Sequence, residues 1–125
     1  MAKTVHDDVL DQAFNYIKDN SAWLCVCSTE PTTYTEAVTT YKLARVAIDS
    51  TDFTGPAAGD TNGRKLTSNE QGGMTVDVSA TAAHIALCDS VNSKLLYVTT
   101  CTPALLQLGN TVTVPAWDIE IADPS

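Results

Sequence analysis

The sequence predicts a mainly β fold, an antiparallel β-sandwich or barrel with one amphipathic α-helix at the N-terminus. Apolar residues recur at helical spacing only within the first 20 residues or so. The remaining chain consists of short apolar or alternating runs that are separated by turn residues, which is typical of an all-β body. We find no internal repeat, βαβ alternation or linker. We therefore expect a single domain over 1–125, with the helix in 1–20 and the β-rich body in 21–125.

The predicted helix has one apolar stripe. Thr4 followed by Asp7 resembles a capping box, which places the start of the helix near these residues. Leu10, Phe14 and Ile17 then lie on one helical face. This face is expected to dock on the sheet or on a partner subunit.

The strands are predicted from alternation and from turn residues. In 22–28, Leu24 and Val26 share one face, while Trp23, Cys25 and Cys27 share the other. A polar stretch rich in Gly, Pro and Asp is expected to form a long loop over 49–63. Further strands are expected at 41–48, 64–68, 74–80, 82–88, 94–101 and 111–121, with a turn at 72–73.

Pro115 interrupts the last predicted strand. Val112 and Val114 share one parity, whereas Trp117, Ile119 and Ile121 share the other. A bulge or an edge position at the proline reconciles the two patterns.

The charge balance excludes several classes of protein. Seven Lys and Arg stand against fifteen Asp and Glu, giving a formal charge of −8. The longest basic run is the pair Arg64-Lys65, so we expect no direct binding to nucleic acid. No segment approaches the roughly 20 apolar residues that span a bilayer, and the N-terminus lacks the apolar core of a signal peptide. We expect synthesis in a cytoplasm and no membrane partner.

No catalytic motif is present in the sequence. It has no Walker loop, dinucleotide fingerprint, GxSxG elbow or HExxH helix. The carboxylates fall on a solvated helix face or in loops, and no nucleophile stands beside a base. We therefore predict a protein that is not an enzyme and holds no cofactor or metal.

Four cysteines, Cys25, Cys27, Cys88 and Cys101, form the one constellation with possible chemistry. One interpretation is four buried thiols that act as small hydrophobes. A second is a disulfide of Cys25 or Cys27 with Cys88 or Cys101, within one chain or between subunits. A direct Cys25–Cys27 bond is disfavoured, because the two side chains project in parallel. The third interpretation, a zinc site that includes His84, has a spacing that matches no familiar zinc module.

Several segments together resemble a known family. They are Ala13-Phe14-Asn15-Tyr16-Ile17-Lys18, Cys27-Ser28-x-x-Pro31-Thr32-Thr33-Tyr34-x-Glu36-Ala37, Gly63-Arg64-Lys65-Leu66-Thr67, His84-x-Ala86-Leu87-Cys88-Asp89 and Asp118-Ile119-Glu120-Ile121-x-Asp123-Pro124. The chain resembles small virion structural proteins of tailed bacteriophages over nearly its whole length.

The resemblance implies a non-catalytic subunit of the phage particle, found in the virion after synthesis in the host cytoplasm. The first expectation is a capsid decoration (cement) protein, and the alternative is a head–tail collar, neck or fibre component. Its partners would be the capsid or neck protein. Cys25, Cys88 and Cys101 depart from the family pattern, which suggests oxidative cross-linking particular to this chain.

The small size of the chain favours self-association, because burial between subunits adds stability that a small core lacks. We expect a closed homo-oligomer, with a trimer preferred. A function of another class is a host-surface or glycan-binding module. In that alternative, aromatic side chains would stack on sugars: Tyr16, Trp23, Tyr34, Tyr41, Tyr97 and Trp117.

Overall fold

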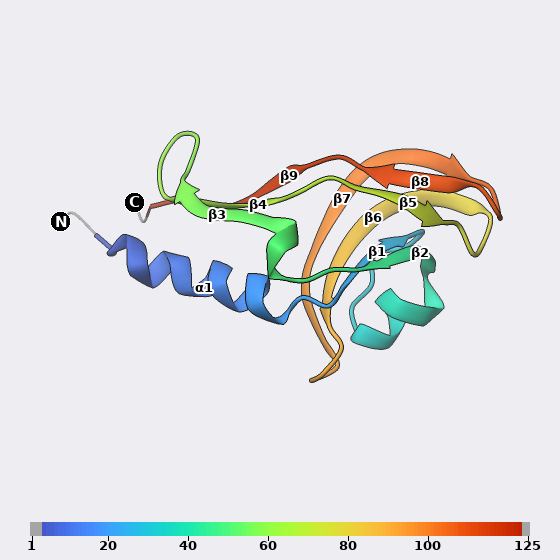
Figure 1. The fold of residues 1–125 in the computed structure, drawn as a ribbon, viewed down its shortest axis with the longest axis horizontal. Helices are drawn as coiled ribbons and strands as arrows, with labels where there is room; N and C mark the ends of the chain where they lie inside the picture. Colours follow the sequence, from blue (N-terminus) through green and yellow to red (C-terminus); the bar gives the residue numbers. More distant parts are fainter. Residues whose placement is uncertain (1–3, 124–125) are drawn as a thin grey trace.

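The computed structural model describes residues 4–123, which fold into two stacked β-layers and one N-terminal helix (Figure 1). The predicted mainly β, antiparallel class with one N-terminal helix is confirmed, and the arrangement is sandwich-like rather than a closed barrel. The elements are α1 (Asp7–Asn20), β1 (Trp23–Cys27), the π-helical turn η1 (Glu36–Thr40), β2 (Lys42–Ala47), the 3₁₀ turn η2 (Ser50–Asp52), β3 (Phe53–Ala58), β4 (Arg64–Ser68), β5 (Gln71–Thr75), β6 (Ala80–Asp89), β7 (Lys94–Leu106), β8 (Thr111–Val114) and β9 (Trp117–Ile121).

One layer is a continuous antiparallel sheet with the strand order β2-β1-β6-β7. The other layer consists of two shorter sheets placed end to end, β3-β4-β9 and β5-β8. β4 runs on into β5 and β8 runs on into β9, so the same two chain segments cross both short sheets (Figure 1). We call this the split layer.

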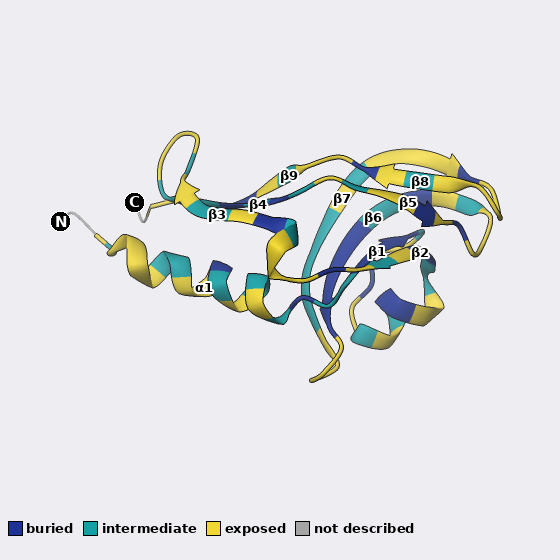
Figure 2. Cartoon of the chain, viewed as in Figure 1, coloured by how far each residue is buried: buried dark blue, intermediate teal, exposed yellow. Residues whose placement is uncertain are grey.

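The core lies between the layers and beneath the helix (Figure 2). From β1, Leu24 and Val26 point into it, as the alternation predicted, and Cys25 and Cys27 occupy the other face. The largest fully buried side chains of this core are Phe14, Leu24, Val26, Leu66, Val76 and Leu87.

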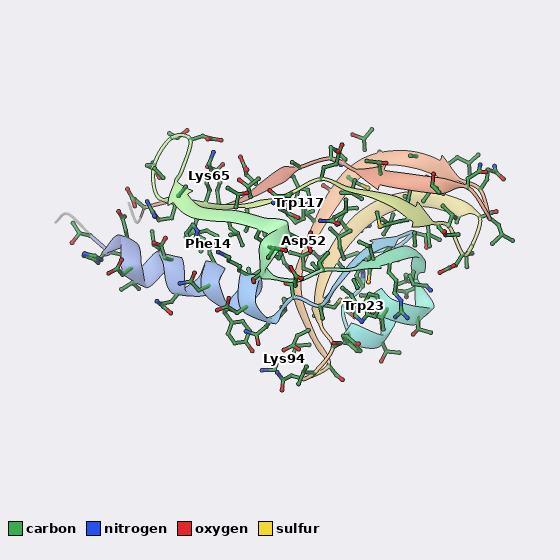
Figure 3. The ribbon with its side chains drawn as sticks, in the orientation of Figure 1. Phe14, Trp23, Asp52, Lys65, Lys94 and Trp117 are labelled. Atoms are coloured by element: carbon green, nitrogen blue, oxygen red, sulfur yellow. The ribbon has the colours of Figure 1, made fainter. Side chains whose placement is uncertain are left out.

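Helix α1 begins at Asp7, and its N-cap is His6, whose side chain accepts a hydrogen bond from the Asp8 backbone N–H. The predicted capping box of Thr4 and Asp7 is therefore wrong, because the His6 imidazole, and not the Thr4 hydroxyl, caps the first turn of the helix. Phe14 is fully buried, and Leu10 and Ile17 are half-buried. Figure 3 shows Phe14 between the helix and β3.

Two predicted loop features are strands in the structure. The expected loop over 49–63 contains η2 and β3, and β3 escapes detection because only its first residue, Phe53, is buried. Gly72 and Gly73 lie inside β5 and not in a turn, so the strand expected at 74–80 begins earlier and ends at Thr75. A register shift between Gln71 and Met74 accommodates Gly73, whose φ is +69°.

The strand expected over 111–121 is two strands. β8 ends at Val114 and pairs with β5, whereas β9 begins at Trp117 and pairs with β4. Pro115 separates them, because it has no N–H for the ladder. The predicted change of parity is thus a change of sheet. β7 is also longer than expected and reaches Leu106 instead of ending at Cys101.

Candidate functional site

One edge of the sandwich carries little charge: β7 beyond Lys94 and β8 have none, and β9 has Asp118 and Glu120. From Leu95 to Trp117 the sequence contains no Asp, Glu, Lys, Arg or His. This stretch forms nearly all of β7, the turn after it and β8. β7 is the outer strand of its sheet, and β8 and β9 are the outer strands of the split layer. We call this region, 95–117, the uncharged edge.

The outer end of this edge is apolar and exposed. Leu105 is 69% exposed and Leu108 is 67% exposed, and both lie near the turn that joins β7 to β8. The Leu108 N–H donates to Ser79 Oγ at 2.7 Å, which holds this turn against the loop that contains Val78, itself 50% exposed. We call Val78, Leu105 and Leu108 the tip. Exposed apolar side chains that gather in this way mark a surface for association.

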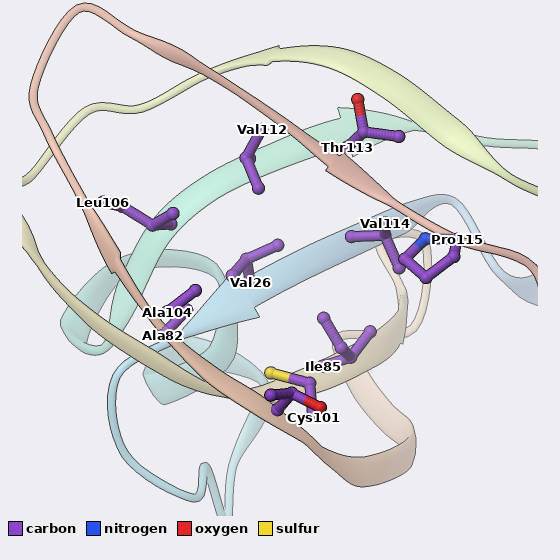
Figure 4. A pocket seen from close by; sticks show the side chains of 11 residues that line it. Val26, Ala82, Ile85, Cys101, Ala104, Leu106, Val112, Thr113, Val114 and Pro115 are labelled. Atoms are coloured by element: carbon purple, nitrogen blue, oxygen red, sulfur yellow. The ribbon is translucent and has the colours of Figure 1, made fainter.

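A cleft opens between the two layers along the same edge. Two adjoining hollows of about 180 and 330 Å³ share Ile85, Cys101, Thr102, Val114 and Pro115. Figure 4 shows the first hollow, with β7 on one side and β8 on the other. The hollows form because β7 and the split layer diverge after the turn and are not hydrogen-bonded to one another.

The lining of the cleft is suited to binding and not to catalysis. Its side chains are aliphatic, hydroxyl, thiol and indole, and Asp118 is the one charged residue among them. Asp118 accepts from Thr67 Oγ1 at 2.7 Å and lies 3.6 Å from Lys65 Nζ, so it is neutralised within the fold. The Trp117 indole nitrogen is buried and has no hydrogen-bond acceptor among the described residues. The cleft therefore offers mainly apolar and hydroxyl contacts.

A second cluster lies on the outer face of the four-stranded sheet. Cys25, Cys27 and Cys88 are all 0% exposed there. The covering chain, 28–41, includes η1 and packs Ala37 and Val38 against the thiols. Within this chain, the Glu36 carboxylate accepts from both the N–H and the hydroxyl of Thr32. We call 28–41 the cover segment.

Burial and hydrogen bonding raise the pKa of two of the three thiols of this cluster, Cys25 and Cys27. The Cys25 thiol is hydrogen-bonded to Cys88, and this bond together with burial raises the pKa of Cys25 far above its ordinary value. The same hydrogen bond lowers the pKa of Cys88. Burial raises the pKa of Cys27 to about 12, and its Sγ donates to the Ala37 carbonyl at 3.5 Å. Buried neutral thiols of this kind are poor nucleophiles.

All four cysteines are free in the structure. Cys25 and Cys88 lie on the same face of adjacent strands, so the structure brings this predicted pair together. Cys101 lies on the opposite face of the sheet, in the cleft, and is therefore not placed to bond with Cys25 or Cys27 of its own chain. A Cys25–Cys88 disulfide stays a prediction. Within 4–123, no group of three or more His, Cys, Asp or Glu is arranged to hold a metal ion.

The aromatic residues proposed for glycan stacking do not form one surface. Trp23 lies under the Arg45 guanidinium, 4.1 Å from its ring centroid, and Tyr97 stacks on Trp117 with ring centroids 5.6 Å apart. Trp23, Tyr34 and Tyr41 pack on the thiol cluster, whereas Tyr16 stands near Lys94. Packing between neighbouring elements accounts for most of these positions.

Three of the six basic side chains in the described part of the chain pair with carboxylates. Arg64 Nε donates to Asp11 Oδ1 at 2.8 Å, and Lys65 Nζ donates to Asp60 at 2.7 Å. Lys42 pairs with Asp77 in the same way. The net charge of −8 is therefore carried by the remaining acidic residues, which lie in α1, in the loops and on the other strands.

Comparison with known family models, curated proteins and solved structures gives no match to this chain. Among the described residues, no helix is long and apolar enough to cross a membrane.

The sequence contained a signal for the uncharged edge, namely the absence of charge over 95–117, but only the strand order shows that this stretch lies at the rim of the sandwich.

Proposed function

We propose that this chain is a non-catalytic structural subunit of a tailed-phage particle that works by self-association and by docking onto a larger protein lattice. The uncharged edge, with its exposed tip and its apolar cleft, is the observation that carries the self-association. Such a surface is suited to contact with another protein.

The electrostatics favour this edge as the contact. Two copies of a chain with a net charge of −8 repel each other when acidic faces meet. Along 95–117 the copies approach without placing like charges together. Association there also covers Leu105 and Leu108, and the burial of a large aliphatic side chain contributes roughly 1.5–3 kcal/mol.

The particle setting is supported by the resemblance of the sequence to virion structural proteins. A small subunit bound over the junctions of a shell contacts several neighbours at once, so weak single contacts add up through avidity. The simplest form of the proposal is a decoration protein on the capsid exterior, made in the host cytoplasm and retained in the virion. A collar, neck or fibre subunit is the second form.

Quantitative mass spectrometry of purified virions tests the setting. A decoration protein is expected on the order of hundreds of copies per particle, in fixed ratio to the major capsid protein, because shell symmetry multiplies its sites. A few tens of copies at most would favour the neck form. The portal protein serves as the internal standard for a low-copy component. Absence of the chain from particles that remain intact and infectious would refute the particle role.

A further inference from the structure

The contact geometry rests on the proposed self-association. We propose that two copies of this chain pair through the outer edge of β7 about a two-fold axis. The tip of each copy then lies over the cleft of the other. The uncharged edge thus supplies both halves of one contact.

The backbone of β7 is suited to such pairing. One side of the strand is hydrogen-bonded to β6, and no strand lies on its other side in the described structure. Thr100, Thr102 and Ala104 are exposed along it. A long free edge offers unpaired N–H and C=O groups to another chain, and proteins commonly protect such edges with charge or proline. Beyond Lys94 this strand has no charge, and Pro103 is its one proline.

The side chains complete the contact. We place the two-fold axis near Thr102 and Pro103, so that the C-terminal part of one β7 lies opposite the middle of the other in an antiparallel pair. The middle of β7, around Thr99 to Thr102, is where the cleft opens. Leu105 and Leu108 of one copy are thereby brought toward Pro115 and Trp117 of the other. Because Pro103 removes one donor from the edge, side-chain burial contributes much of the affinity.

A second copy is the occupant that the charges favour. Acidic residues are concentrated elsewhere, for example Asp7, Asp8 and Asp19 on α1, so contact between two copies through that helix would bring carboxylates together. A contact through the uncharged edge is self-complementary, because each copy presents the same tip and the same cleft.

The pairing has an order of two and not the threefold ring that chain size and family resemblance suggested. Because β7 pairs with β7, the same strand contacts itself, and a patch that contacts itself generates a two-fold, isologous interface. A ring of three requires two different patches on each subunit.

Light scattering after gel filtration, over a wide range of protein concentration, tests the pairing. The wild-type chain is expected at twice the 13.3 kDa chain mass when concentrated. The variant L105E/L108E places two carboxylates at the tip and is expected to weaken dimerisation by about 100-fold or more. Both positions are more than half exposed, so the variant is expected to fold. The matched control is V91E, at an apolar position that is 88% exposed in the turn between β6 and β7.

Cys101 provides a second readout that needs no substitution. It lies in the cleft and is partly exposed, whereas the other three cysteines are buried. Its reaction with a maleimide is expected to slow as wild-type concentration rises through the dimerisation range, and to stay constant for L105E/L108E.

The possible results distinguish a failure of the β7 pairing from a failure of the proposed self-association. A wild-type dimer that persists in L105E/L108E, or a wild-type trimer, would overturn the β7 pairing and leave the proposed self-association intact. A strictly monomeric chain with constant Cys101 reactivity would overturn both the pairing and the self-association. Copy number in virions, measured independently, decides the particle role.

Discussion

Phe14→Ala should be the most destabilising single substitution in α1. Phe14 is 0% exposed and is the one buried residue of the helix, where it packs into the core that Leu66 and Phe53 also form. Leu10 and Ile17 are only half-buried. Truncation of a buried phenylalanine to alanine costs about 3–5 kcal/mol, because it removes apolar contacts and leaves a cavity. The total stability of a domain of this size is on the order of 5–15 kcal/mol, so the loss is a large fraction of it.

Urea denaturation at neutral pH measures the effect, with the helix followed by circular dichroism and the core by tryptophan fluorescence. Phe14→Ala is expected to lower the free energy of unfolding by about 3 kcal/mol or more, and the melting temperature by roughly 10–20 °C. Val9→Ala is the matched control, since Val9 is on the same helix and is 62% exposed. Its effect should stay within about 0.5 kcal/mol.

The comparison can fail in two ways. A loss below about 1 kcal/mol for Phe14→Ala would mean that the helix does not depend on this core. A loss for Leu10→Ala equal to that for Phe14→Ala would mean that the helix docks through a different face. Either result contradicts the packing of α1 described here.

Three further outcomes are expected. Asp11→Asn should lower the urea midpoint, by less than Phe14→Ala, because it breaks the two-point contact with Arg64 that ties α1 to β4; Arg64→Leu made in the same background should then add little. Hydrogen bonds from Asn92 and nearby N–H groups lower the pKa of Asp89. The stability that Asp89 contributes is therefore present above its unfolded pKa of about 3.9 and is lost as pH falls through the lower folded value. Asn92→Ala should make the free energy of unfolding fall less steeply at acid pH, and an unchanged dependence on pH would contradict this. In dilute solution at pH 8, a thiol reagent should modify Cys101 alone within minutes and the other three cysteines only on unfolding, and mass spectrometry of the product checks the position.

Features set by local periodicity could be predicted from the sequence. The spacing of Leu10, Phe14 and Ile17 identified the helix, and the alternation in β1 assigned Leu24 and Val26 to one face and Cys25 and Cys27 to the other. Both patterns depend only on the repeat of a regular element, which neighbouring residues determine.

Features set by pairing between distant segments could not be predicted. Cys88 lies beside Cys25 because β6 pairs with β1 in one particular register. No residue near Cys88 in the sequence specifies that partner. β3 was missed for a related reason. It is an outer strand of its sheet and contains Gly55 and Pro56, so its composition is that of a loop.

The break in the split layer has a mechanical consequence. Ser68 pairs with Trp117 at the end of one short sheet and Gln71 with Val114 at the start of the other, so no ladder bond crosses between them. A shear or bend along this line breaks no interstrand hydrogen bond. The half that packs on α1 can therefore tilt against the half that packs on β1 and β2, at the cost of side-chain contacts alone. A subunit that spans two facets of a lattice gains compliance from such a line, and amide exchange at Glu70 and Ala116, which lie at the line in the two crossing segments, would report it.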